Sequence, residues 1–529
     1  MNPFDRNIHL NRLYQNICWD IIVIGGGATG LGTALDAASR GLKTLLLEQY
    51  DFAKGTSSRS TKLVHGGVRY LAQGDIGLVR EALKERGLLK INAPHLVKKQ
   101  AFIIPCYHWF AKLKYLLGLK LYDWLSGKFS FGNSTMLSTF ELDTLLPTIR
   151  KGHVGGVAYF DGQFDDARLA INLAQTCSEQ GGTTINYMQV TGLTKDSHDK
   201  INGVTAYDTE NKKEYQLKSK IVINATGVFV DEILQMDTPH RKPLVRPSQG
   251  VHIVLDRSFL PGDKAIMIPK TSDGRVLFAV PWHEHILVGT TDTPLATHRI
   301  EPIALQEEID FILATTAQYL TRAPSADDIK SVFAGLRPLA APGKNVGSTK
   351  EISRSHKLIV GESQLITITG GKWTTYRKMA EDTVNKALKV GHLPTSPCIT
   401  PHLRIHGFSN PSEGAFAFYG SDEKQVEQLQ ASDTRFGETL MPGSPYTVAH
   451  VLWAVRHEMA MTVEDVLARR LRVLFLDARS AMAMAQRVAE IMAQELGYDH
   501  HWQDIQVQQF DKLAHQYTVN PHEKVHLDN

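Results

Sequence analysis

Residues 20–48 read DIIVIGGGATGLGTALDAASRGLKTLLLE, and this stretch decides the fold. Ile21–Ile24 form a short apolar, β-branched run, as in a strand that is buried on both faces. Three glycines of the pattern G-x-G-x-x-G follow directly, and residues 31–40 have the small side chains of a helix that packs on a sheet. A second apolar run then ends at Glu48. The stretch therefore predicts a strand, a tight turn, a helix and a second parallel strand.

The glycines have the spacing that a dinucleotide pyrophosphate requires. Gly25 allows the tight turn, Gly27 lets the backbone approach the phosphates, and Gly30 lets helix and strand pack closely. The N–H groups of the helix start point toward bound phosphates. Glu48, 18 residues after Gly30, is placed to accept the ribose hydroxyls, which favours FAD or NAD over NADP. The alternative is a glycine-rich turn in some other α/β domain.

Composition describes an ordinary globular chain with ample core. The 529 residues suggest roughly three domains, with 43% hydrophobic and 21% charged residues. A net charge of +3 without a basic block gives no reason to expect nucleic acid. We expect no metal site, no signal peptide and no membrane-spanning run. Reduced thiols are expected in a cytosolic compartment, because the four cysteines are far apart: Cys18, Cys106, Cys177 and Cys398.

Several further segments carry glycines, hydroxyls and cations together. Residues 55–71 read GTSSRSTKLVHGGVRYL, which suits a loop and helix start around a polyphosphate, although a capped surface loop is the alternative. Residues 164–169 read FDDARL, and residues 221–227 form a short strand that ends in NATG. Residues 365–377 read LITITGGKWTTYR, a strand followed by a glycine turn and a helix start, and so a second anion or carbonyl site.

Together these motifs resemble the FAD-dependent glycerol-3-phosphate dehydrogenases, in the D-amino-acid-oxidase-like superfamily of flavoproteins. The resemblance covers residues 20–400 and the tail. It implies an α/β fold: a Rossmann-like FAD-binding domain, an antiparallel-sheet substrate domain and a C-terminal helical domain. We assign residues 18–75, 150–228 and 331–392 to the first, residues 76–149 and 229–330 to the second, and residues 400–529 to the third.

The resemblance also implies which residues hold FAD. The motif residues expected to contact it are Gly25, Gly27, Thr29, Gly30, Glu48, Thr56, Ser57, Ser58, Lys62, Gly66, Gly67, Ala225, Gly227, Gly371, Lys372 and Thr374.

The implied reaction is hydride transfer from C2 of sn-glycerol 3-phosphate to flavin N5, which leaves dihydroxyacetone phosphate. Arginine matches phosphate oxygens bidentately, and a surface ion pair is the alternative for each cation. His65 is the candidate base, since imidazole titrates near neutral pH; packing on the flavin or covalent attachment to it are the alternatives. Arg337 would polarise the ketone or bind the phosphate. The expected substrate-binding residues are Arg69, Tyr70, Arg337, Arg354 and Lys372.

The electron acceptor implied by the resemblance is a membrane quinone, or O2 in oxidase relatives. With a quinone, we expect a cytoplasmic protein that binds peripherally to the inner face of the cell membrane, with a homodimer as one possible assembly. Residues 105–126 combine apolar residues and lysines, so they suit a lipid-interface helix or equally a core or subunit-contact helix. The rival functions are a superfamily oxidase of an amine or 2-hydroxy acid and a non-catalytic FAD-binding module.

Coarser patterns predict the remaining elements. Residues 76–104 are expected to be helical with a break at Pro94, and the segments after residue 410 are expected to be helical. Thr462 and Asp465 have the spacing of a capping box. One antiparallel sheet is expected from residues 246–254, 265–269, 275–281 and 285–289.

Overall fold

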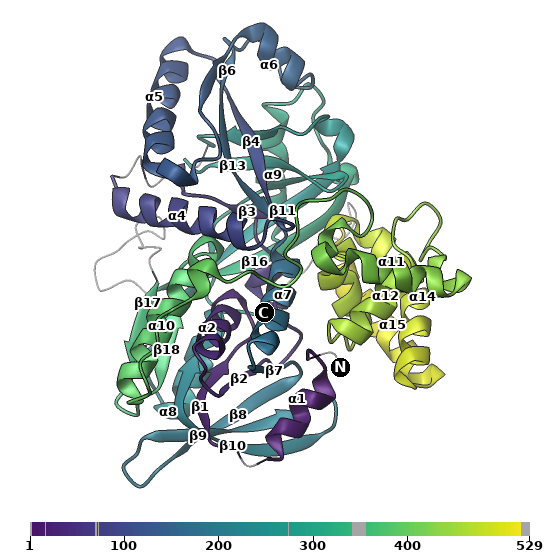
Figure 1. The fold of residues 1–529 in the computed structure, drawn as a ribbon. Coiled ribbons are helices and arrows are strands. Elements are labelled where there is room, and N and C mark those ends of the chain that lie inside the picture. Colours follow the sequence, from purple (N-terminus) through teal and green to yellow (C-terminus); the bar gives the residue numbers. More distant parts are fainter. Residues whose placement is uncertain are drawn as a thin grey trace.

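The computed structural model describes residues 3–15, 17–68, 71, 74–272, 274–340 and 356–519. They form two β-sheets and a C-terminal group of helices, which Figure 1 shows in yellow-green to one side of the sheets. The chain passes from the first sheet to the second and back, so each sheet is assembled from distant segments. The predicted α/β fold with an antiparallel second sheet and a helical C-terminus is confirmed.

The first sheet contains the parallel core that the glycine motif predicts. Its strand order is β17-β18-β10-β1-β2-β7, and β17 alone in this order runs antiparallel to its neighbour. Two further strands, β8 and β9, continue antiparallel from β10. The bounds are β1 Trp19–Ile24, β2 Thr44–Leu47, β7 Thr183–Ile185, β8 Met188–Lys195, β9 Ile201–Asp208, β10 Lys213–Asn224, β17 Lys357–Val360 and β18 Ile366–Thr369.

Alternation along β1 explains the layers on both faces of this sheet. Ile21 and Val23 share a core with the helices α2, α7 and α10, whereas Ile22 and Ile24 share a core with β8, β9 and the helices α1 and α8. The apolar run Ile21–Ile24 is therefore buried on both faces of the sheet, as predicted. The helix bounds are α1 Arg6–Leu13, α2 Ala28–Ser39, α7 Asp166–Glu179, α8 Val230–Asp237 and α10 Tyr376–Val390.

The second sheet has ten strands, and its pairs are antiparallel except β4 with β12. Its longest pairing joins β11 to β16, from Val245 opposite Ala340 to Leu255 opposite Ile329. The strands are β3 Leu63–Val64, β4 Val97–Pro105, β5 Thr135–Leu137, β6 Gly156–Phe164, β11 Val245–Asp256, β12 Ala265–Ile268, β13 Leu277–Trp282, β14 His285–Gly289, β15 Thr293–Pro294 and β16 Ile329–Ala340. The accompanying helices are α4 Ile76–Asn92, α5 Trp109–Ser126, α6 Thr139–Leu145 and α9 Gln306–Ala317.

Two predictions differ from this arrangement. The expected helical region 76–104 is wrong after Asn92, because residues 97–105 form β4, which pairs with β6 over nine positions. The predicted domain ranges placed β6 and most of β16 with the FAD-binding domain, but both strands lie in the second sheet. Their hydrogen-bonded partners, β4 and β11, are distant in sequence, so local pattern could not assign them.

The C-terminal helices pack around their own apolar core, which also takes in Trp282 and Phe333 of the second sheet. The predicted capping box is present: Asp465 N–H donates to Thr462 Oγ1 (3.2 Å), and Thr462 N–H donates to Asp465 Oδ2 (3.1 Å). It precedes a π-helical turn, Asp465–Arg470. The helices are α11 Glu423–Ser432, α12 Val448–His457, α13 Val473–Leu476, α14 Ala478–Leu496 and α15 His500–His515.

Candidate active site

A cavity of about 460 Å³ lies between the carboxyl ends of the parallel strands and the second sheet. On one side it is lined by the glycine turn, Glu48, residues 53–57 and 59–61, residues 225–229 and residues 370–374. On the other side it is lined by residues of the second sheet and its loops, Arg337 among them. The carboxyl ends of parallel strands are where ligands bind in open α/β sheets, so this cavity is the candidate active site.

The glycine turn has the close backbone packing that the dinucleotide-binding motif requires, because neither Gly25 nor Gly30 has room for a side chain. Gly25 has φ +107°, and a Cβ there would lie 2.9 Å from the carbonyl oxygen of Ala225. A Cβ on Gly30 would lie 1.8 Å from the carbonyl oxygen of Gly25, so helix α2 can approach β1 only with glycine at this position. Helix α2 begins at Ala28 beside the cavity and places its positive end there.

Glu48 is fixed for ribose recognition by two backbone donors. Its Oε2 accepts the N–H of Gly26 (2.6 Å), and its Oε1 accepts the N–H of Tyr50 (2.9 Å). Burial raises the pKa of Glu48, while the two N–H groups act in the opposite direction. Each carboxylate oxygen has a further lone pair for a ribose hydroxyl, and Glu48 lines the cavity.

Most of the predicted cofactor residues meet at this cavity. Twelve of the sixteen line it, namely Gly25, Gly27, Thr29, Glu48, Thr56, Ser57, Gly67, Ala225, Gly227, Gly371, Lys372 and Thr374. The segments that carry them are joined by hydrogen bonds: Ala28 N–H donates to Ser57 Oγ (2.9 Å), and Trp373 Nε1–H donates to the carbonyl oxygen of Ser57 (2.8 Å). The loop around Ser57 therefore connects the glycine turn to the start of α10.

The other four, Gly30, Ser58, Lys62 and Gly66, do not line the cavity. Lys62 is fully buried; its Nζ donates to Asp166 Oδ1 (2.7 Å) and to the carbonyl oxygen of Ser58 (2.6 Å). It therefore ties the loop to the start of α7, and the prediction that it contacts the cofactor is corrected.

Gly66 and Gly30 are required by packing. A Cβ on Gly66 would lie 2.6 Å from Tyr122 Oη and from Leu83 Cδ2, so α4 and α5 leave no space for a side chain. Gly66 N–H also donates to Tyr122 Oη (2.8 Å). Gly30 has the helix-packing role that its position in the motif predicts.

The side of the cavity opposite the glycine turn is organised around Arg337. In the antiparallel pairing of β11 with β16, Ser248 lies opposite Arg337, and Gly250 lies opposite Gly335. Arg337 Nη1 donates to Asp292 Oδ1 (3.3 Å), Nη2 donates to Thr290 Oγ1 (3.2 Å), and Ser248 donates to the same Asp292 oxygen. A Cβ on Gly250 would lie 2.4 Å from Arg337 Nη2, so the guanidinium lies in space that this glycine leaves open.

Two histidines line the cavity, and their surroundings differ. His65 is half-buried at the end of β3, and its backbone N–H donates to Thr374 Oγ1 (3.2 Å). His252 is buried, stacks on Phe333 with ring centroids 5.1 Å apart, and hydrogen-bonds through Nε2 to Thr61 Oγ1 (2.9 Å). Burial, followed by the charges of Arg337 and Lys62, holds the pKa of His252 well below its usual value.

Comparison with known proteins decides the family. The FAD dependent oxidoreductase family matches residues 20–377, and the C-terminal domain of alpha-glycerophosphate oxidase matches residues 365–503. The probable mitochondrial glycerol-3-phosphate dehydrogenase of Dictyostelium discoideum is 40% identical over 90% of this chain and 80% of its own length. This chain belongs to the FAD-dependent glycerol-3-phosphate dehydrogenase family. The mitochondrial enzyme of Homo sapiens is 38% identical over 97% of this chain and 75% of its own length.

A solved structure extends the likeness over the whole fold. The glycerol-3-phosphate dehydrogenase of Bacillus halodurans, complexed with FAD, superposes with a TM-score of 0.80 and 28% identity over 99% of both chains. The protein is therefore an FAD-dependent enzyme, and the glycine turn and Glu48 described above are the part of the chain that fits this cofactor.

Two of the five predicted substrate-binding residues lie at the cavity, and the other three lie outside the residues that the structure describes. Arg337 and Lys372 both line the cavity. Arg69, Tyr70 and Arg354 lie outside the described residues, and their roles stay predictions. Sequence reasoning missed His252, Ser248 and Asp292. Two of them could have been found from the sequence. Side chains of a strand alternate between its two faces, so Ser248, Gly250 and His252 share one face of β11.

Proposed function

We propose that this protein oxidises sn-glycerol 3-phosphate to dihydroxyacetone phosphate and passes the electrons to a quinone. The observation that carries the proposal is Arg337, held by Asp292 and Thr290 on the cavity side opposite the glycine turn. The names of the Dictyostelium and human relatives support the same substrate. FAD, when bound, supplies the hydride acceptor.

Arg337 acts on an oxygen that is anionic or becomes so. Its guanidinium is planar and remains charged, so it can bind phosphate oxygens bidentately or stabilise negative charge on the C2 oxygen. Asp292 and Thr290 fix its orientation before the substrate arrives, and such preorganised donors stabilise charge most effectively. Lys372 adds a second positive charge from the segment that precedes α10.

His65 accepts the proton of the C2 hydroxyl. An imidazole can hold this proton near neutral pH, and His65 borders the cavity without being fully buried. His252 suits the role less well, because its Nε2 is already hydrogen-bonded to Thr61 and one of its faces is covered by Phe333. The buried, neutral His252 instead fixes Thr61 beside the cavity.

The first prediction concerns the substrate and the electron acceptor. Anaerobic addition of glycerol 3-phosphate to the FAD-loaded protein is expected to bleach the visible absorbance of the flavin. A short-chain ubiquinone analogue is then expected to restore the absorbance faster than air does. Stopped-flow absorbance measures both steps.

Glycerol and inorganic phosphate, added separately, serve as controls and should leave the spectrum unchanged. Faster recovery with O2 would replace the quinone by oxygen as the acceptor. Bleaching by an amine or a 2-hydroxy acid, with none by glycerol 3-phosphate, would contradict the proposed substrate.

A quinone acceptor requires contact with a membrane, and helix α5 offers a surface for it. The helix exposes large apolar side chains, including Phe110 (85% exposed) and Trp124 (76% exposed), and it also exposes Lys114 and Lys120. Exposed aromatic residues beside lysines suit the interface of an anionic bilayer. Among the described residues, no helix is both long and apolar enough to cross a bilayer. We therefore propose peripheral binding through α5 at the inner face of the cell membrane.

The second prediction tests this surface with serine at Trp109, Phe110 and Trp124. The triple variant is expected to lose most of its binding to vesicles that contain phosphatidylglycerol, because it no longer buries these side chains in the interface. Co-sedimentation measures binding. The matched control carries serine at two exposed apolar residues elsewhere, Ile399 and Ile505, and should bind as the parent does.

Equal vesicle binding by the triple variant and the parent would reject α5 as the membrane contact. If sedimentation velocity showed a dimer that the triple variant abolished, α5 would instead be an interface between two copies of the chain.

A further inference from the structure

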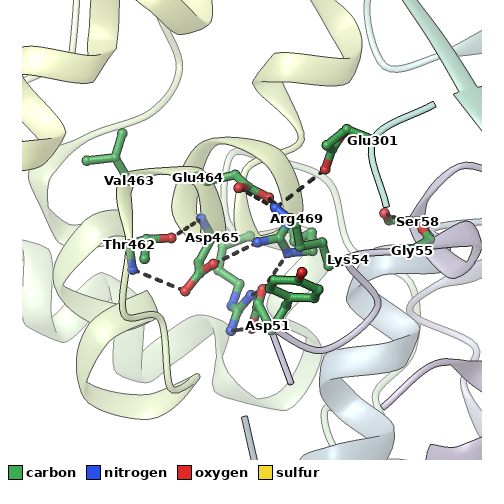
Figure 2. A network of polar contacts seen from close by, with 12 residues as sticks. Asp51, Lys54, Gly55, Ser58, Glu301, Thr462, Val463, Glu464, Asp465 and Arg469 are labelled. Atoms are coloured by element: carbon green, nitrogen blue, oxygen red, sulfur yellow. Dashed lines mark hydrogen bonds and ion pairs between the residues drawn. The ribbon is translucent and has the colours of Figure 1, made fainter. Parts of the chain in front are cut away.

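The segment that follows β2 is held to the C-terminal helices by buried charges (Figure 2). Asp51, fully buried, accepts hydrogen bonds from both Arg469 and Arg470 of the π-helical turn, with Arg470 Nη2 at 2.9 Å. Asp51 and Arg469 are 418 positions apart in the chain. The C-terminal helices therefore contact the chain just after β2, three residues after Glu48, the acid placed for the ribose.

Two further cations of this segment extend the contact. Lys54 Nζ donates to both carboxylate oxygens of Glu464 (2.7 and 2.6 Å) and lies 3.4 Å from Glu301. Arg59 donates to Glu301 (2.6 Å), which also accepts the hydroxyl of Tyr517, beyond α15 (3.1 Å). The segment is thus fixed at three charged positions over nine residues.

The cluster is balanced in charge, which makes it costly to break at one point. Four carboxylates face four cations; the members are Asp51, Glu301, Glu464, Asp465, Lys54, Arg59, Arg469 and Arg470. Removing one member leaves a buried charge without its counter-ion, and this is the unfavourable event for such networks. Burial favours the neutral form of Glu464, but Lys54 and Arg469 outweigh it and lower the pKa of Glu464 to about 2.

The residues between these charged anchors line the cavity. Ala53, Gly55, Thr56 and Ser57 all border it. Ser57 accepts the N–H of Ala28 at the start of α2, and Thr56 Oγ1 donates to the carbonyl oxygen of Leu336 (2.6 Å), next to Arg337. The position of this short segment therefore sets both the phosphate end of the cavity and the strand that carries Arg337.

We infer that the C-terminal helical domain is a clamp that positions the cofactor-binding segment Asp51–Arg59. Its positioning residues are Glu464, Arg469 and Arg470, which act through Asp51 and Lys54. The inference rests on the proposed function only in that FAD occupies this cavity, and it assigns the C-terminal domain a role in cofactor affinity.

The third prediction uses Glu464→Gln, because the Glu464 side chain is 19% exposed and the amide has nearly the same volume. The variant is expected to bind FAD about tenfold more weakly, since Lys54 and Arg469 lose a shared counter-charge. Titration of the apoprotein with FAD, followed by the quenching of flavin fluorescence, gives the dissociation constant. Glu464→Asp keeps the charge and should recover part of the affinity.

The matched control is Glu495→Gln. Glu495 forms a two-hydrogen-bond pair with Arg456 (2.7 Å each) in the same domain but outside the cluster. This variant should bind FAD as the parent does. Thermal unfolding of each apoprotein is measured in parallel, because a purely structural role would lower the midpoint of Glu464→Gln without changing its FAD affinity.

Equal FAD affinity in Glu464→Gln and the parent would overturn the clamp, as would an equal loss of affinity in Glu495→Gln. The titration contains no glycerol 3-phosphate, so these outcomes leave the proposed substrate untouched. A parent protein that takes up no FAD would overturn the clamp and the proposed function together.

Discussion

Arg337→Ala is expected to lower kcat/KM for glycerol 3-phosphate by about 10³-fold while FAD stays bound. The guanidinium lies on the side of the cavity opposite the glycine turn, so its removal leaves the dinucleotide contacts intact. It also removes the cation that pairs with Asp292, beside a substrate that is itself an anion. Steady-state kinetics, with FAD content measured from absorbance, tests the prediction.

The same experiment separates the two roles open to Arg337. A fall in kcat at unchanged KM indicates stabilisation of charge on the C2 oxygen, and a rise in KM at unchanged kcat indicates phosphate binding. Arg322→Ala is the matched control, because Arg322 also pairs with an aspartate, Asp328, but is 64% exposed and lies away from the cavity. Unchanged turnover in Arg337→Ala would remove this residue from the mechanism.

Gly250→Ala tests the position of Arg337 without removing its charge. The added methyl would lie 2.4 Å from Arg337 Nη2 and 2.6 Å from Thr290 Oγ1, and both atoms are side-chain ends that can move. The fold and FAD binding should persist while kcat/KM falls, since a misdirected guanidinium no longer meets the substrate. Wild-type kinetics in Gly250→Ala would show that the orientation seen here does not matter for turnover.

The cofactor side of the cavity could be predicted because its determinants are local. The turn needs Gly25, Gly27 and Gly30 within six residues, and the ribose acid follows at the end of the next strand. The strands β11, β13 and β14 were also predicted, because short apolar runs separated by turn residues are typical of strands, and all three are largely buried. The structure of these elements is determined by residues close together in the sequence.

What sequence could not provide depends on contacts between distant positions. Lys62 stands in a hydroxyl-rich loop beside the expected phosphates, but its actual partner is Asp166, 104 positions away. Residues 97–105 continue an apolar pattern that a helix also satisfies, and only pairing with β6 makes them a strand. The contacts of Asp51 could not be predicted either, because they depend on the π-helical turn at 465–470 lying against the segment after β2. Neither periodicity nor a motif encodes such pairings.

His65→Gln is expected to lower kcat by about 10²-fold or more and to change how kcat depends on pH. Activity requires the imidazole to be neutral, so in the parent kcat falls as the pH drops through the pKa of the base. That acidic limb should disappear from the small residual rate of His65→Gln, because no group of that pKa then accepts the proton. A pH–rate profile between about pH 5.5 and 8.5 covers the range in which an ordinary imidazole titrates.

The His252→Gln variant is the control that shows which of the two histidines produces the acidic limb. Burial and the charges of Arg337 and Lys62 hold the pKa of His252 well below its usual value, which favours the neutral imidazole, so we expect His252 to contribute no limb. The His252 variant should therefore turn over more slowly if Thr61 shifts, yet keep the acidic limb of the parent. An acidic limb that survives in His65→Gln and is lost in His252→Gln would transfer the base from the half-buried histidine to the buried one, and would require the hydroxyl of Thr61 to carry the proton between substrate and imidazole.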